Sequence, residues 1–319
     1  MKPNQDEYAY IDSLLKRAPD NFQHWVLSEV DYKNRKYPIH AFEIGPDDPT
    51  VPVIGLFGGV HGLEKIGSHV VLSYLNYLFE QLSWNKSLNY LFENVRLVSI
   101  PMVNPVGVYH NFRSNGNGVD LMRNAPMESD EKVAFMIGGH RLSNKIPWYR
   151  GRENKLELES ETLINFVKER MYQASFSQAI DFHSGFGIKD RLWYPYASST
   201  KQFPDLSTVN KVSALFNKTI PHHVYIIEPQ CVQYTTHGDL WDYMYEEQRK
   251  SRDSNANIFL PWTLEMGSWI WFKKNPIQIL SPHGLFNPMK DHRFSRTMRR
   301  HFLMIDFFIK ATESYKGWL

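Results

Sequence analysis

The segment from residue 51 to residue 105 has a pattern of elements that few folds can accommodate. It opens with the apolar run "VPVIGLFG" at 51–58, which is bounded by Pro and Gly and is typical of a strand covered on both faces. Residues 64–82 then repeat apolar side chains at helical intervals, and the β-branched run at 93–105 ends in an Asn-Pro turn. Strand, helix and strand in this order form the unit of a parallel sheet with a right-handed crossover. The segment therefore predicts an α/β fold.

The rest of the chain repeats this pattern more loosely. We expect a helix at 158–175, followed by a strand at about 178–183. Further strands are predicted at 222–229 and 262–267, and a closing helix at about 293–315. The region 106–156 is rich in Gly, Asn, Arg and Pro, so it is predicted to form long loops, which are uncommon in a compact domain unless they build a site.

Composition indicates a globular chain without a strong preference for polyanions. Of its 319 residues, 42% are hydrophobic and 22% are charged, which suits one large domain with a full core. The formal net charge of +2 provides no global field that would favour nucleic acid or an anionic membrane, so neither is an expected partner. The basic cluster "HRFSRTMRRHF" at 292–302 has helical spacing, and we interpret it as the solvated face of the closing helix.

Cysteine content and the first residues bear on the compartment. The single cysteine, Cys231, excludes an intramolecular disulfide framework and a cysteine-based zinc site. The first twenty residues acquire acidic groups before any apolar run long enough for a signal peptide, and no later run is long enough to span a membrane. We therefore expect a cytoplasmic protein.

Polar side chains stand where three of the predicted strands end. His61 follows the strand at 51–58, His183 ends "QAIDFH", and Glu265 lies in "WTLEMG". Ligand sites in open α/β sheets lie outside the carboxyl ends of the strands, so these residues and Glu64 are expected to meet. Catalytic zinc takes three nitrogen or oxygen ligands and keeps one position open, and two His with one Glu is a recurrent set. His61 and Glu64, three residues apart, can share one ion, and His183 is the natural third ligand.

The pair His61 and Glu64 does not by itself establish a metal site. The pattern H-x-x-E occurs by chance in many chains and equally fits a surface pair at the start of a helix. Four more segments follow it in order: the chain carries "HGLE" at 61–64, "NPVG" at 104–107, "RSNGNGVDLMRN" at 113–124, "DFHSG" at 181–185 and "TLEMG" at 263–267. In this order the five segments resemble the motifs of the zinc metallocarboxypeptidase family.

The resemblance spans about 50–270 and implies a fold. That fold is three-layered, with a mixed, mostly parallel central sheet of about eight strands flanked by helices. We expect a single domain overall, with a catalytic domain at 46–319 and residues 1–45 as an N-terminal extension packed on it. Within the extension, "FQHWVLSEV" fits either a strand or a cap.

The resemblance also implies roles for individual residues. His61, Glu64 and His183 would ligate one Zn²⁺ ion. Glu265 matches the general base, which activates the metal-bound water and later protonates the leaving amine. Arg113 matches the arginine that polarises the scissile carbonyl and stabilises the oxyanion.

Further residues match positions around the substrate and behind the ligands. Arg123 matches the arginine that grips the substrate's terminal carboxylate with its planar fork. Asp120 matches a carboxylate that accepts the other ring N–H of His61. Asp181, two residues before the second histidine ligand, points to the same face of its strand and is expected either to orient a group in the site or to make a structural hydrogen bond. Tyr234, in "VQYTTHGDLWDY", is the best placed candidate for a tyrosine above the zinc.

Two positions depart from the family's pattern. Leu63 stands where the family often carries an arginine, and Met122 stands where it keeps an asparagine that binds the substrate's carboxyl terminus. Both changes replace polar contacts, so the substrate is either a small peptide or an acyl-amino acid. The prediction is a zinc-dependent hydrolase of carboxypeptidase type, which cleaves an amide bond next to a carboxylate-bearing residue. The alternatives are an N-acyl amino acid amidohydrolase, similar to succinylglutamate desuccinylase and aspartoacylase, and a non-catalytic metal-binding module.

Overall fold

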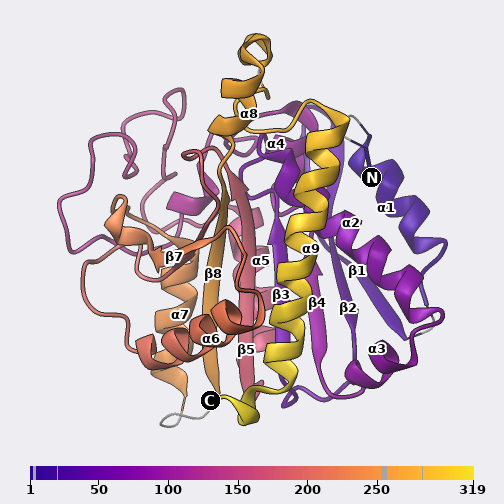
Figure 1. Cartoon of the computed structure of the whole chain (residues 1–319). Helices are drawn as coiled ribbons and strands as arrows, with labels where there is room; N and C mark the ends of the chain where they lie inside the picture. The colour runs from indigo at the N-terminus through magenta and orange to yellow at the C-terminus, as the bar shows by residue number, and fades with distance from the viewer. Residues whose placement is uncertain (3–4, 20, 253–256, 282) are drawn as a thin grey trace.

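An eight-stranded mixed sheet forms the centre of the molecule (Figure 1). The computed structural model describes residues 1–2, 5–19, 21–252, 257–281 and 283–319. The strands follow the order β1-β2-β4-β3-β5-β8-β6-β7. Their bounds are β1 Phe22–Tyr32, β2 Arg35–Ile44, β3 Val53–Gly58, β4 Arg96–Ile100, β5 Phe176–Ser184, β6 Arg191–Tyr194, β7 Ile226–Pro229 and β8 Ile258–Met266. The pairs β4/β3, β3/β5, β5/β8 and β6/β7 are parallel, and the pairs β1/β2, β2/β4 and β8/β6 are antiparallel.

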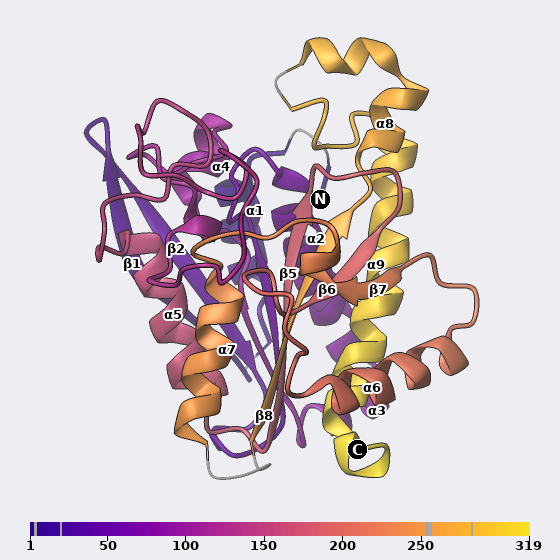
Figure 2. The ribbon, with the colours of Figure 1, turned by 90° about the vertical axis from the view of Figure 1, so that its left-hand side faces the viewer.

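Helices cover both faces of this sheet, as Figure 2 shows in the view along its edge. One face carries α2 (Lys65–Leu82), α6 (Leu206–Thr219) and α9 (Asp291–Glu313), and the other carries α5 (Leu158–Met171) and α7 (Leu240–Ser251). The shorter helices are α1 Glu7–Leu15, α3 Lys86–Leu91, α4 Pro105–His110 and α8 Trp269–Lys274, with 3₁₀ turns η1 Leu121–Arg123, η2 Gln230–Val232, η3 Pro276–Leu280 and η4 Tyr315–Gly317. The predicted three-layer α/β architecture is confirmed.

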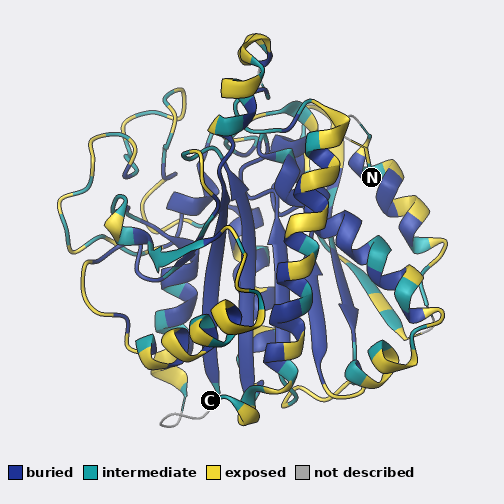
Figure 3. Cartoon of the chain, in the orientation of Figure 1, coloured by how far each residue is buried: buried dark blue, intermediate teal, exposed yellow. Residues whose placement is uncertain are grey.

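The central strands are buried along their whole length, which explains why their sequences read as continuous apolar runs (Figure 3). The prediction at 51–58 corresponds to β3, and the prediction at 178–183 corresponds to β5. Two other strands have different bounds from those predicted. The strand β8 begins four residues before 262, and β7 occupies only the second half of 222–229. The region 106–156 holds mainly turns, together with most of α4 and the short η1.

The first 45 residues contribute two strands to the sheet. β1 and β2 form a hairpin in which Tyr32 pairs with Arg35, and β2 continues the sheet by pairing with β4. The two residues of the turn, Lys33 and Asn34, have φ values of 49° and 61°. Left-handed values at both central positions are those of a type I′ hairpin turn, which a Gly-containing sequence signals more clearly than Lys-Asn. The segment "FQHWVLSEV" is therefore the start of an edge strand rather than a cap.

The closing helix α9 is two-sided, as its sequence predicts. Phe294, Met298 and His301 are buried against the core, whereas Arg296 and Arg299 are exposed. Arg296, Arg299 and Arg300 of the basic cluster thus lie on the solvated side of the helix, whereas Arg293 is half-buried and His301 is buried. Within the described part of the chain, helices are too short or too polar to cross a lipid bilayer.

Candidate metal and substrate site

Three buried side chains converge at the carboxyl ends of β3 and β5. His61 lies in the turn after β3, Glu64 immediately precedes α2, and His183 is the penultimate residue of β5. One nitrogen or oxygen atom from each of them lies within 4.8 Å of the others. The fold therefore brings together, from two strand ends, the three residues predicted as metal ligands.

The two imidazole rings face the carboxylate through the same kind of atom. Nδ1 of His61 lies 2.9 Å from Oε1 of Glu64, and Nδ1 of His183 lies 3.1 Å from its Oε2. The two Nδ1 atoms are themselves 3.2 Å apart. Burial alone would raise the pKa of Glu64, but the two histidines hold it below its usual value. A bound cation would stabilise two imidazole nitrogens and a carboxylate that lie this close together away from water.

The opposite nitrogen of each ring has a carboxylate of its own. Nε2 of His61 lies 3.1 Å from Asp120 Oδ1, and Nε2 of His183 lies 2.7 Å from Asp181 Oδ2. When Nε2 of His183 carries the ring proton and donates it to Asp181, the lone pair of its Nδ1 points toward Glu64, while Nε2 of His61 lies 3.0 Å from Arg113 Nη2 as well as next to Asp120. Carboxylate–histidine pairs of this kind fix the tautomer and orientation of metal ligands. Two His and one Glu suit zinc, with a fourth position left for water or substrate.

Small residues allow the loop that carries His61 to turn tightly. Gly59 has a φ of +67°, a conformation that side chains other than glycine rarely adopt. A Cβ atom on Gly62 would lie 1.9 Å from the main chain of Gly107, the last residue of "NPVG". In that motif Asn104 caps α4 through its side chain and also donates to the carbonyl of Val60 at 3.3 Å. The motif thus supports the metal loop from behind.

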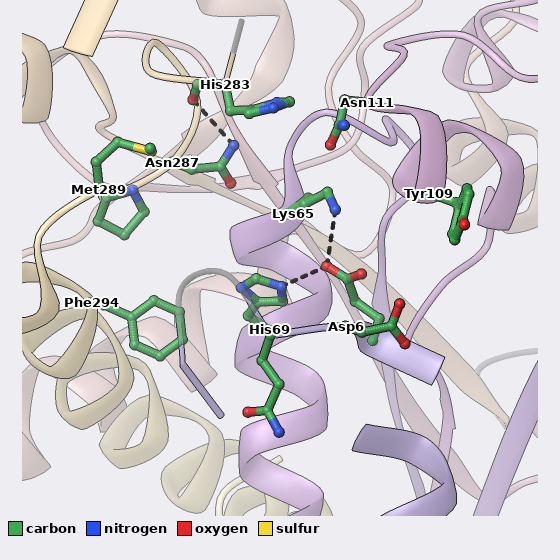
Figure 4. Close-up of a pocket in the computed structure, with 12 residues that line it drawn as sticks. Asp6, Lys65, His69, Tyr109, Asn111, His283, Asn287, Met289 and Phe294 are labelled. Carbon is green, nitrogen blue, oxygen red and sulfur yellow. Dashed lines mark hydrogen bonds and ion pairs between the residues drawn. The ribbon is translucent and has the colours of Figure 1, made fainter. Parts of the chain in front are cut away.

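A residue far along the chain ties the same loop down. The carboxamide of Asn287 accepts a hydrogen bond from the Ile66 amide at 2.8 Å and donates one to the Leu63 carbonyl at 2.8 Å. These two main-chain groups stand on either side of Glu64. Figure 4 shows Asn287 beside Lys65 in a cavity next to this loop. Glu7 also lines the cavity, and its Oε1 lies 2.8 Å from Nε2 of His69. Asn287 had no signal in the sequence.

Arg113 reaches across the ligand cluster from the loop after α4. Its Nη1 lies 3.2 Å from Glu64 Oε1, and its Nε donates to Asp120 Oδ2 at 3.0 Å. Burial alone would raise the pKa of Asp120, yet the charges of Arg113 and His61 hold it well below its usual range. Asp120 is therefore a carboxylate shared between a candidate ligand and the predicted oxyanion-binding arginine.

Glu265 stands on the neighbouring strand, directly beside the histidine ligand. In the parallel pairing of β5 with β8 it is the register partner of His183. Its Oε1 accepts a hydrogen bond from the Phe186 amide at 3.0 Å. Burial, followed by the negative charge of Glu64, raises the pKa of Glu265 above its usual value. The charge of a bound cation would act in the opposite direction.

Comparison with known protein families places the chain. A family model described as zinc carboxypeptidase matches residues 8–269. The chain belongs to this family. The match covers all three candidate ligands as well as Arg113 and Glu265, and it also includes the hairpin β1–β2.

Two curated carboxypeptidases match part of this chain at low identity. The carboxypeptidase N catalytic chain of Rattus norvegicus is 26% identical over 174 residues, which is 49% of this chain and 35% of the relative. Carboxypeptidase SOL1 of Arabidopsis thaliana is 23% identical over 220 residues, 66% of this chain and 39% of the relative. The chain therefore spans little more than a third of the length of these curated relatives.

Two solved structures extend the likeness to nearly the whole chain. Thrombin activatable fibrinolysis inhibitor aligns with a TM-score of 0.70 at 16% identity, covering 96% of this chain and 73% of that one. Carboxypeptidase A from Helicoverpa armigera aligns with a TM-score of 0.68 at 18% identity, covering 96% and 72%. At these identities the structures establish the shared fold.

Within this zinc carboxypeptidase fold, Arg123 and Tyr234 lie next to each other. Arg123 is buried, and its guanidinium donates to the carbonyls of Met122 at 3.3 Å and Ile137 at 3.4 Å and also lies within hydrogen-bond reach of the Tyr234 hydroxyl. Burial raises the pKa of Tyr234 to about 12, against the nearby positive charge of Arg123. The ring of Tyr234 packs against Phe186, with ring centroids 5.9 Å apart. Arg123 thus keeps donor capacity that a carboxylate could use.

The two departures from the family pattern occupy different surroundings. Met122 is 3% exposed and belongs to the hydrophobic core. Leu63 is half-buried, and its carbonyl is the one that Asn287 holds. The side chain of Met122 therefore contributes packing, while Leu63 places an apolar group next to the ligand loop.

Asp181 has a second partner that sequence reasoning missed. Its Oδ2 accepts a hydrogen bond from the indole of Trp241 at 2.8 Å as well as facing His183. Trp241 lies in the segment "GDLWDY" at 238–243, shortly after Tyr234, and only Tyr234 stood out from the sequence pattern there. The contact joins α7 to the end of β5 that carries the candidate ligand His183.

Proposed function

We propose that the chain is a zinc-dependent hydrolase of carboxypeptidase type, which cleaves the amide bond next to a carboxylate-bearing residue. The observation that carries the proposal is the buried cluster of His61, Glu64 and His183, with Glu265 and Arg113 beside it. A single zinc ion held by the three ligands would supply a Lewis acid and lower the pKa of a water molecule. The donor set and its supporting carboxylates fit that ion.

Glu265 is proposed to move the proton. It accepts a proton from the attacking water and then donates it to the nitrogen of the leaving amine, which is the work of a general base that becomes a general acid. Its position beside His183 and the hydrogen bond from the Phe186 amide, which holds one carboxylate oxygen, support this role.

Arg113 is proposed to stabilise the charge that develops on the carbonyl oxygen. A fixed guanidinium close to the ligands is suited to an oxyanion, because its donors are aimed before the reaction starts. Its contacts with Glu64 and Asp120 hold the side chain in that region. The charge of Asp120 balances that of the arginine.

Arg123 and Tyr234 are proposed to bind the substrate. The guanidinium of Arg123 offers a planar fork for a carboxylate, and its present acceptors include distant carbonyls. A tyrosine hydroxyl keeps its proton at neutral pH, and burial raises the pKa of Tyr234 further, to about 12. It can therefore donate a hydrogen bond to the substrate.

A second candidate is hydrolysis of N-acyl amino acids. The apolar Leu63 next to the ligand loop favours it, because a family arginine that would contact a peptide is replaced there. Both substrates, a small peptide and an acyl-amino acid, present an amide next to a carboxylate. Arg123 would serve either one.

The test is the activity of zinc-loaded wild type and of Glu265→Gln on a mixed panel of C-terminal peptides and N-acyl amino acids. We expect the variant to retain zinc and to lose about 10²- to 10⁴-fold in kcat, since general acid–base catalysis is removed. Glu161→Gln, the same change at an exposed position on α5, should leave kcat unchanged. A zinc-loaded wild type that cleaves neither class of substrate would instead support a non-catalytic metal-binding module.

A further inference from the structure

A basic cleft of about 240 Å³ lies between α8, the amino-terminal part of α9 and the loop that joins β5 to β6. Its lining carries five cationic side chains: Lys189, Lys274, Arg293, Arg296 and Arg300. The candidate metal ligands and Glu265 do not line it. Figure 1 shows α8 and the start of α9 at the end of the sheet where β8 finishes.

Helical spacing gathers the arginines on one side of α9. Arg293, Arg296 and Arg300 are three and four residues apart, so they share a face of the helix. Arg293 is half-buried, and its Nη1 donates to the carbonyl of Trp271 at 2.7 Å. One cation of the basic cleft is therefore held in position by the main chain of α8, and its remaining donors are available.

The charges of the basic cleft are not balanced within it. Its one carboxylate, Asp190, bonds Arg300 at 2.6 Å and also accepts the Gly267 amide at 2.9 Å. Among the residues that the structure describes, no ion pair within 4.0 Å involves Lys189, Lys274, Arg293 or Arg296. Like charges gathered without counterions repel one another, and a bound anion relieves that repulsion.

We propose that the basic cleft binds a small molecule that bears a phosphate group. Besides Arg300, which pairs with Asp190, the basic cleft has four cations. Four positive charges favour a ligand with two negative charges over a singly charged carboxylate, and phosphate oxygens accept hydrogen bonds from the planar guanidinium groups of arginine. The cleft also has an apolar wall, formed in part by Ile270 and Trp271, against which a hydrophobic part of the ligand can pack. Its volume restricts the ligand to a small molecule. The site is separate from the proposed hydrolase site and does not depend on that function.

Calorimetric titration of the full chain with phenyl phosphate, and with inorganic phosphate as a second probe, tests the site. We expect one molecule bound per chain, tighter binding of phenyl phosphate, and weakening by added sodium chloride because the charges are exposed. The double variant Lys274→Ala with Arg296→Ala should weaken binding by about tenfold or more, the loss expected for charge-assisted hydrogen bonds. Both side chains are exposed, so melting temperatures should stay close to that of the wild type.

The matched control removes one lysine and one arginine from the same two helices, at positions outside the basic cleft. Lys273 and Arg299 are exposed neighbours that do not line the basic cleft, and Lys273→Ala with Arg299→Ala should leave the affinity unchanged. Equal losses in both double variants would overturn the proposal in favour of general electrostatic attraction. No loss in either would place the bound phosphate elsewhere, for example at Arg113. Tighter binding of a short DNA duplex, lost with the Lys274 and Arg296 variant, would assign the cleft to nucleic acid and also overturn the proposal.

Discussion

The cation-binding half and the carboxylate-binding half of the candidate site are held in place by different forces. In the first half each imidazole has its own carboxylate, Asp120 for His61 and Asp181 for His183. In the second half Arg123 donates hydrogen bonds to main-chain carbonyls at 3.3 Å and 3.4 Å, and Tyr234 is its aromatic neighbour. The first half is thus prearranged by charge, whereas the guanidinium of the second is held by main-chain carbonyls and a tyrosine hydroxyl. Substitutions should separate the two halves into metal effects and substrate effects.

The largest effect is expected from removing a ligand. His183→Ala deletes one of two nitrogen donors, and we expect the protein to lose stoichiometric zinc after dialysis and, with it, hydrolytic activity. Metal analysis by mass spectrometry measures the first, and a peptide assay the second. His222→Ala, at an exposed histidine, should retain both. Full zinc occupancy in His183→Ala would contradict the assignment of this ligand.

Next comes the carboxylate behind that ligand. Asp181→Asn keeps the size of the side chain and removes the charge that orients His183, so zinc affinity should fall by about 10- to 100-fold. Competition with a zinc chelator gives the affinity. Asp306→Asn serves as the control, because that carboxylate accepts from Tyr74 at 2.6 Å rather than from a histidine. An unchanged affinity in Asp181→Asn would mean that the residue only anchors Trp241.

Substitutions in the carboxylate-binding half should not change the zinc content of the protein. Arg123→Lys keeps the charge but loses the planar fork, so KM should rise by about tenfold while zinc content stays at the wild-type level. Steady-state kinetics on the best substrate of the panel separates KM from kcat. Arg152→Lys makes the same change at an exposed position and should have no effect. A fall in kcat with an unchanged KM would instead mean that Arg123 acts in the transition state and does not contribute to binding the substrate in the ground state.

The smallest effect is expected at Asn287, which touches the ligand loop only through the main chain. Asn287→Ala removes three hydrogen bonds, those with the Ile66 amide and with the carbonyls of Leu63 and His283, each worth about 1 kcal/mol net, so the melting temperature should drop by a few degrees and zinc affinity by a few-fold. Asn287→Asp keeps the acceptor for the Ile66 amide and loses the donor to Leu63. The carboxylate oxygen that replaces the amide nitrogen faces the carbonyls of Leu63 and His283, so this variant should also melt below the wild type, and equal melting temperatures in all three proteins would show that the clamp is dispensable.

The sequence predicted the parts of the site that lie within short segments. His61 and Glu64 are three residues apart, and His183 and Glu265 each end a buried strand, so local patterns were enough to suggest that they meet. Asn287 could not be found in this way, because its partners lie more than 200 residues away and an isolated Asn has no pattern. Contacts of this kind exist only after the chain has folded.

The same limit applies to the fold. The buried strands β3, β5 and β8 read as apolar runs, whereas the edge strand β1 has no fully buried residue and alternates weakly. β6 is only four residues long and was not predicted. An edge strand and a very short strand depend on their neighbours for pairing, and a single sequence shows little of this.

The hydrogen bonds of Asn287 show that residues beyond the family match are needed to hold the loop with the candidate ligands in place. The family match ends at residue 269, but the clamp on the ligand loop and the whole of α9 come after it. α9 packs on β3 and β5, and its Phe308 lies against Trp262 with ring centroids 5.6 Å apart. A chain cut at residue 269 would expose that face of the sheet and release Leu63 and Ile66. The smallest piece able to fold around the metal must therefore extend well beyond the last recognisable motif.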